Sequence, residues 1–172
     1  MKHLRLYLCL LLLPLLLTGC KRPQEEPVPP VAAGFTCGFT GTYRGEAVAG
    51  KLERSSAGLL TVSLTEPQEL AGLVAEWDGE QVTLRLMGLS WSVDAGTVPQ
   101  AALGERVLGA LDAVVYGTAA GTVGADGRLT ITGEAGDGAS FTLYADPKTG
   151  ALSALSVPSE ELELTFSDFT TA

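Results

Sequence analysis

The chain has 172 residues, enough for one domain, and its 20 Asp and Glu against 11 Lys and Arg give a net charge of −9. This acidic balance argues against nucleic acid as a partner, because phosphate backbones require clustered Lys and Arg. It argues equally against electrostatic docking on anionic lipid, and is sufficiently explained by the solubility of an acidic domain.

Residues 1–19 have the pattern of a bacterial secretory signal peptide. Lys2 and Arg5 form a basic leader, and the apolar run Leu6–Leu17 is shorter than the roughly 20 residues that span a bilayer. Leu17-Thr18-Gly19-Cys20 then resembles the lipobox of bacterial lipoproteins. The resemblance implies cleavage before Cys20, a diacylglyceryl thioether on that cysteine, and anchoring in the cell membrane facing outside the cytoplasm. The alternative is an ordinary cleaved signal followed by a chance cysteine.

Residues 20–33 are expected to form a tether after the lipidated cysteine. The segment contains Pro23, Pro27, Pro29 and Pro30 and almost nothing hydrophobic to bury. Proline-rich chain favours extended polyproline II, which acts as a semi-rigid spacer. Two acyl chains on Cys20 suffice for stable anchoring, where one chain is marginal.

Cleavage also removes residues that common enzyme chemistry would need. Without Lys2 and Arg5 the basic count falls from 11 to 9 against 20 acids, a balance of −11. The one histidine, His3, is lost too, which excludes histidine-based nucleophile triads and the common zinc sites. Cys37 lies beside Phe35 and Phe39, which favours a small buried hydrophobe over a reactive or intermolecular thiol.

Residues 34–172 read as an antiparallel β domain. Apolar and polar residues alternate with a period of two, typical of half-solvated strands, over 60–65, 82–87, 129–132, 141–144 and 161–166. Turn residues separate the strands at 78–79, 125–128, 136–138 and 146–150. Such close spacing predicts a meander without crossover helices between most strands.

One long helix is predicted near residues 99–116, with a single helical turn at 67–72. Pro99 suits the first turn and Gly117 the end of the long helix. The polar side is expected to hold Glu105, Arg106 and Asp112. The apolar stripe contains Ala102, Val107, Leu108, Leu111, Val114 and Val115. Covering the apolar face of the sheet is the obvious way to bury this stripe. The predicted fold class is therefore mainly β with one main helix (α+β).

Several local patterns from about Phe35 to Phe169 resemble the LolA/LolB-like lipoprotein superfamily, which includes lipid-carrying lipoproteins of mycobacteria. They are the strand and proline turn of 64–72, the hairpin of 77–84, the Val98-Pro99 helix entry, and the closing strands at 141–146, 150–155 and 162–169. The resemblance implies an unclosed antiparallel half-barrel, covered by a lid helix, with a hydrophobic cavity that binds lipids or acyl chains. The chain departs from the family in having one clear lid helix and a short length.

Two functions follow, and neither is enzymatic. The first is a membrane-anchored carrier or binder of a lipid-like ligand in the cell envelope. Its expected cavity lining is Leu60, Val62, Leu64, Val82, Leu84, Leu86, Trp91, Leu108, Leu111, Ile131, Phe141 and Leu143. The alternative is an envelope scaffold or stress sensor that binds another protein and has a filled core.

Other motifs favour structural roles. Trp91, expected in the loop before the helix, either caps the core edge or lies on the cavity rim. The adjacent Glu160 and Glu161 do not face each other across a cleft, and the glycines of 117–138 suit turns. Asp126 and Asp137 lie in turns without the ligand spacing of a calcium loop. We therefore expect no catalytic residue, metal site or cofactor.

The lipobox makes a direct prediction. Cys20→Ala should abolish incorporation of radiolabelled palmitate, because the thiol that receives the diacylglyceryl group is removed. Cys37→Ala should leave incorporation unchanged. Equal labelling of the Cys20→Ala variant and the native chain would contradict lipidation at this position.

Overall fold

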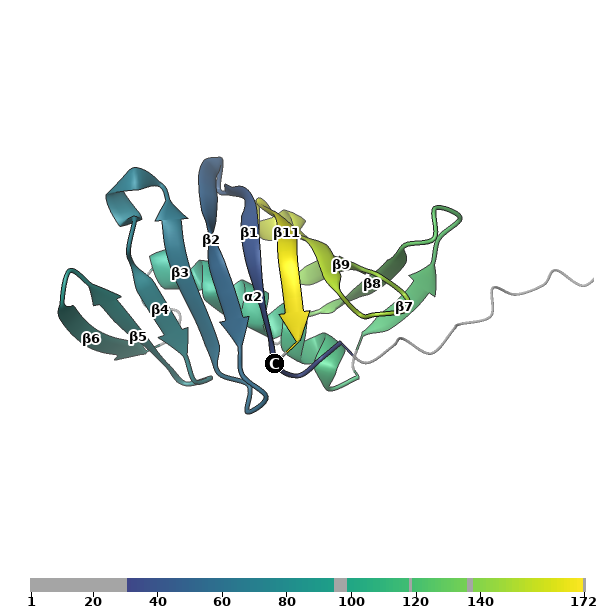
Figure 1. The fold of residues 1–172 in the computed structure, drawn as a ribbon, viewed down its shortest axis with the longest axis horizontal. Coiled ribbons are helices and arrows are strands. Elements are labelled where there is room, and N and C mark those ends of the chain that lie inside the picture. The colour runs from purple at the N-terminus through teal and green to yellow at the C-terminus, as the bar shows by residue number, and fades with distance from the viewer. Residues whose placement is uncertain (1–30, 95–98, 118, 136–137, 172) are drawn as a thin grey trace, which may run out of the picture.

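The computed structural model describes residues 31–94, 99–117, 119–135 and 138–171 (Figure 1). The signal peptide, Cys20 and the tether as far as residue 30 lie outside the described residues, so they remain predictions from the sequence. Residues 136–137 of one predicted turn lie outside as well. Within the described part, no helix is long and apolar enough to cross a bilayer.

The described residues form one eleven-stranded antiparallel sheet that does not close into a barrel, which confirms the predicted fold class. The order across the sheet is β6-β5-β4-β3-β2-β1-β11-β10-β9-β8-β7. The strands are β1 (Phe35–Tyr43), β2 (Glu46–Arg54), β3 (Leu60–Glu66), β4 (Val74–Trp77), β5 (Gln81–Leu86), β6 (Leu89–Asp94), β7 (Ala120–Val123), β8 (Leu129–Glu134), β9 (Ser140–Ala145), β10 (Leu152–Val157) and β11 (Leu162–Thr171). The helices are η2 (Gln68–Leu70), α2 (Pro99–Val115) and η3 (Pro158–Glu160).

The predicted hairpin turns at 78–79, 125–128 and 146–150 are confirmed. Gly79, Gly127 and Gly150 all have positive φ, a conformation that costs glycine little. The Asp78 carboxylate accepts the backbone N–H groups of residues 80 and 81, and these hydrogen bonds lower its pKa. The turns therefore follow from local chemistry that is visible in the sequence.

The region before the helix differs from its prediction. Trp91 lies in strand β6, not in a loop, and Met87 is a turn residue, not part of a strand. Leu86 pairs with Leu89, which leaves Met87 and Gly88 as a two-residue turn with φ of 51° and 82°. Two-residue hairpin turns favour Asn-Gly or Asp-Gly, so Met-Gly gave no clear turn signal.

Helix α2 joins strands β6 and β7, which are consecutive in the chain but lie at opposite edges of the sheet. The chain must therefore cross the whole sheet between them, and Figure 1 shows α2 lying across one face. A helix of 17 residues is about 25 Å long. Since β6 precedes α2 in the chain and β7 follows it, α2 is a strap between the two edges of the sheet, not a flap at one edge.

The strap lies close to the sheet because small side chains face it. Val107, Ala110 and Leu111 are buried in the core. A Cβ added to Gly104 would come within 2.2 Å of the Trp77 indole, so the tryptophan packs directly on the helix backbone. The small residues at 104 and 110 bring α2 into contact with the side chains of the sheet.

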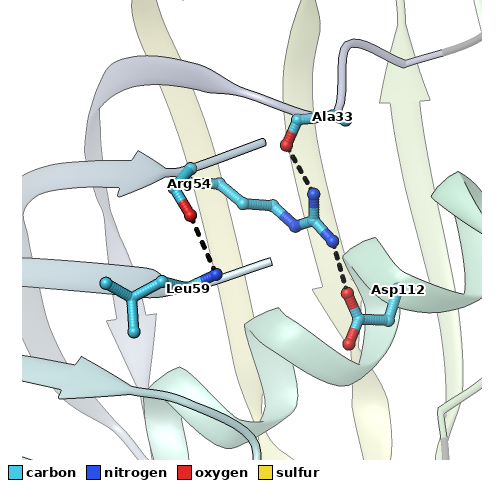
Figure 2. A network of polar contacts seen from close by, with 5 residues as sticks. Ala33, Arg54, Leu59 and Asp112 are labelled. Atoms are coloured by element: carbon cyan, nitrogen blue, oxygen red, sulfur yellow. Dashed lines mark hydrogen bonds and ion pairs between the residues drawn. The ribbon is translucent and has the colours of Figure 1, made fainter. Parts of the chain in front are cut away.

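Two residues expected on the polar, solvent-facing side of the helix, Arg106 and Asp112, make ion pairs with other elements. Arg106 pairs with Glu160 of η3, and Asp112 pairs with Arg54 at the end of β2. Arg54 is 1 % exposed, and its guanidinium lies between the carbonyl of Ala33 and the Asp112 carboxylate (Figure 2). The two hydrogen bonds measure 2.5 and 2.6 Å. This contact, called here the Arg54 clamp, joins the start of the domain, strand β2 and the helix.

The Arg54 clamp predicts an asymmetric response to substitution. Asp112→Ala should lower the free energy of unfolding by about 2–4 kcal/mol, because it leaves the buried Arg54 charge without its carboxylate. Chemical denaturation measures the change. As a control, Glu76→Ala breaks the solvent-exposed pair with Arg85 and should cost about 0.5 kcal/mol or less. Equal losses in the two variants would contradict the clamp.

Candidate functional site

The twelve residues expected to line a cavity lie mostly in a packed core. Ten of them are buried, whereas Leu86 is half-buried and Trp91 is 41 % exposed. The ten buried residues belong to a single hydrophobic cluster that includes residues of the sheet and of α2. The interior therefore matches the filled-core alternative more closely than a large lipid cavity, because α2 rests directly on the sheet.

A smaller apolar pocket opens at one end of the half-barrel, between α2 and the ends of strands β1 to β3. Its volume is about 240 Å³. The apolar walls are Val48, Leu64, Pro67, Leu70 and Leu103. Three polar residues, Tyr43, Arg44 and Glu46, complete the lining. We call this space the mouth pocket. Of the twelve predicted residues, Leu64 is the one found in its lining.

Local sequence explains this arrangement. Tyr43 pairs with Glu46 across a two-residue turn in which Arg44 and Gly45 have φ of 52° and 82°. On β2, Val48, Leu52 and Arg54 are buried toward the helix, and alternation places Glu46 on that same face. Strand β2 thus begins with Glu46 at the mouth pocket and ends with Arg54 in the Arg54 clamp.

A charged network borders the mouth pocket. The Glu160 carboxylate forms two ion pairs. Its Oε2 lies 2.9 Å from Arg44 Nη2, and its Oε1 lies 3.1 Å from Arg106 Nη2. The Arg44 guanidinium also lies 5.1 Å from the centre of the Tyr43 ring. The hydrogen bond to Glu160 is the main cause that raises the pKa of Arg44. The network joins the β1–β2 turn, η3 and α2, and so holds the cation of Arg44 in place beside the pocket.

The Tyr43 hydroxyl group is covered from water and has no hydrogen-bond partner among the described residues. Burial is the largest cause that raises its pKa. An unpaired buried hydroxyl costs roughly 1–3 kcal/mol.

Sequence reasoning missed this site almost entirely. Glu160 was considered only with its neighbour Glu161, which was expected to point outward at the head of a strand. Glu161 is exposed, as expected, but it ends η3 and precedes the first residue of β11. The spacing of Arg44, Arg106 and Glu160 along the chain carries no local pattern. The available signal was the pair of polar residues, Arg44 and Glu46, that flank Gly45 at the end of an apolar strand.

A second feature is an apolar surface on the β5–β6 hairpin. Met87, Leu89 and Trp91 are 92, 69 and 41 % exposed. Leu89 and Trp91 pair directly with Leu86 and Leu84, so their side chains continue the core face of the sheet beyond the part that α2 contacts. This hairpin surface is a place where an apolar partner would fit.

Cys37 is buried, as expected, and burial raises the pKa of its thiol to about 12. Within the described ranges no three His, Cys, Asp or Glu side chains are grouped to hold a metal ion. The mouth pocket is suited to receiving an apolar group beside fixed charges of both signs.

No protein-family model and no curated protein matches the chain. Among solved structures, an uncharacterised conserved protein from Thermus thermophilus is similar at 12% identity and a TM-score of 0.48, covering 83% of this chain and 80% of that one. A LolA superfamily protein from Nitrosomonas europaea is similar at 9% identity and a TM-score of 0.40, covering 87% and 90%. The superfamily resemblance therefore continues to rest on the local sequence patterns.

The two tryptophans should differ in accessibility. Acrylamide should quench Trp91, which is 41 % exposed, and leave Trp77, which is 2 % exposed, largely unquenched. Trp91→Phe should therefore remove most of the quenching, whereas Trp77→Phe should leave it. Strong quenching that persists in Trp91→Phe would place the β5–β6 hairpin elsewhere.

Proposed function

We propose that the chain is a lipid-anchored protein of the cell envelope that binds a hydrophobic ligand, a lipid or an acyl chain, in the mouth pocket. The anchor is the diacylglyceryl group expected on Cys20. The observation that carries the binding proposal is the mouth pocket itself, an apolar concavity bordered by polar residues, which is the usual form of a ligand site.

The size of the pocket limits the ligand. Its volume of about 240 Å³ is below the roughly 300–1,000 Å³ of sites that enclose drug-sized molecules. One end of a single chain is therefore the part that enters, while the rest of the ligand stays outside. The filled core behind the pocket supports the same limit, because α2 leaves no room for a second chain among Val107, Leu111 and the sheet.

The hairpin surface favours a second candidate function, an envelope scaffold or sensor that binds another protein. Met87 and Leu89 are large, apolar and mostly exposed, and strand β6 is an edge of the sheet. An apolar edge strand is a common place for partner binding. The two functions use different parts of the molecule and are separable by substitution.

Filling the mouth pocket should weaken ligand binding. Leu70→Trp places a larger side chain in the pocket from η2, and we expect at least about tenfold weaker binding of decyl glucoside, an uncharged single-chain amphiphile. Isothermal titration calorimetry below the micelle-forming concentration measures it. The control Leu89→Trp adds the same bulk on the exposed hairpin and should bind as the native chain does.

The outcomes separate the hypotheses. Native-like binding by Leu70→Trp would place the ligand outside the mouth pocket. Loss of binding in Leu89→Trp alone would favour the hairpin surface. If the native chain binds neither decyl glucoside nor a charged amphiphile of the same chain length, the lipid-binding proposal is overturned.

A further inference from the structure

We propose that the mouth pocket selects a single-chain amphiphile with a zwitterionic head group, whose phosphate binds Arg44 and whose ammonium group binds Glu46. The assignment rests on the proposed function, since it requires the chain of the ligand to enter the pocket. It adds the chemical class of the ligand and two residues that determine specificity.

Arg44 and Glu46 are placed to act together. Both line the mouth pocket, and they flank Gly45 in the β1–β2 turn. Glu46 lies opposite Tyr43 in the strand pairing, on the face of β2 that also carries the pocket wall residue Val48. One turn therefore presents a cation and an anion at the same opening, directly above apolar walls.

The guanidinium of Arg44 is held in position before any ligand binds. It donates to Glu160 at 2.9 Å and lies over the Tyr43 ring. A guanidinium has five N–H donors in a planar fork, and the contact with Glu160 uses Nη2. The side chain is 53 % exposed, so its other donors remain within reach of a phosphate, for which this geometry is well suited.

The two charges together disfavour heads of one sign. An anionic head at Arg44 shares the pocket opening with the Glu46 carboxylate, in a chain whose net charge is already −9. A cationic head that reaches Glu46 meets Arg44. A head that carries both charges places each beside its opposite, whereas an uncharged head gains from neither.

The test compares three probes that share a ten-carbon chain: decylphosphocholine, decanoate and decyl glucoside. Each is titrated by calorimetry, below its micelle-forming concentration, into the native chain and into Arg44→Gln and Glu46→Gln. Arg85→Gln, which alters an arginine of β5 paired with Glu76, serves as the control for a lost surface cation. Circular dichroism melting curves check that each variant is folded.

We expect the native chain to bind decylphosphocholine about fivefold or more tightly than the other two probes. Arg44→Gln and Glu46→Gln should each weaken decylphosphocholine binding several-fold more than decyl glucoside binding, and so remove most of this preference. Glu46→Gln should also strengthen decanoate binding, because the repelling carboxylate is gone. Arg85→Gln should change none of the three affinities.

Equal affinity of the native chain for all three probes, unaffected by either variant, would overturn the head-group assignment and leave the proposed function standing. If Arg44→Gln weakens the binding of all three probes equally, the assignment is also overturned, because Arg44 would then have a structural role. If the native chain binds none of the probes, the proposed function fails together with the assignment.

Discussion

The ion pair between the buried Arg54 and Asp112 ties α2 to strand β2, and the close contact of this helix with the sheet shapes the rest of the structure. Arg54 is one of the most deeply buried large side chains, yet it carries a permanent charge. Its burial is tolerable because it meets the Asp112 carboxylate of α2 and the carbonyl of Ala33. A helix displaced from the sheet would leave that charge without a partner, so the clamp favours one position of the strap.

With α2 held down, hydrophobic side chains fill the space that a lipid carrier would otherwise use. The helix also lies between β6 and β7 in the chain, the two edge strands of the sheet, so its path crosses the sheet from edge to edge. The clamp acts on the C-terminal half of the helix, whereas the mouth pocket lies beside Leu103 near its other end. Room for a ligand therefore remains where the polar network around Glu160 replaces close apolar packing.

The sequence predicted the local structure better than the site. Period-two alternation identified β3, β5, β8, β9 and β11, and the turns at 78–79, 125–128 and 146–150 were correctly placed, because these signals are local. The helix was predicted to within a residue at its end. Trp91 was misplaced because a Met-Gly turn has no strong signature. The pairing of β1 with β11 and the contacts of Arg44, Arg54 and Glu160 join residues far apart in the chain, and no single-sequence pattern records them.

The central claim is that ligand binds at the mouth while the clamp stays closed. A crystal structure of the chain with decylphosphocholine tests this directly. We expect the decyl chain between Leu70 and Leu103, with α2 in its present position and the contact between Arg54 and Asp112 intact. A decyl chain found between α2 and strands β8 and β9, with that contact broken, would show that the strap opens and would contradict the account.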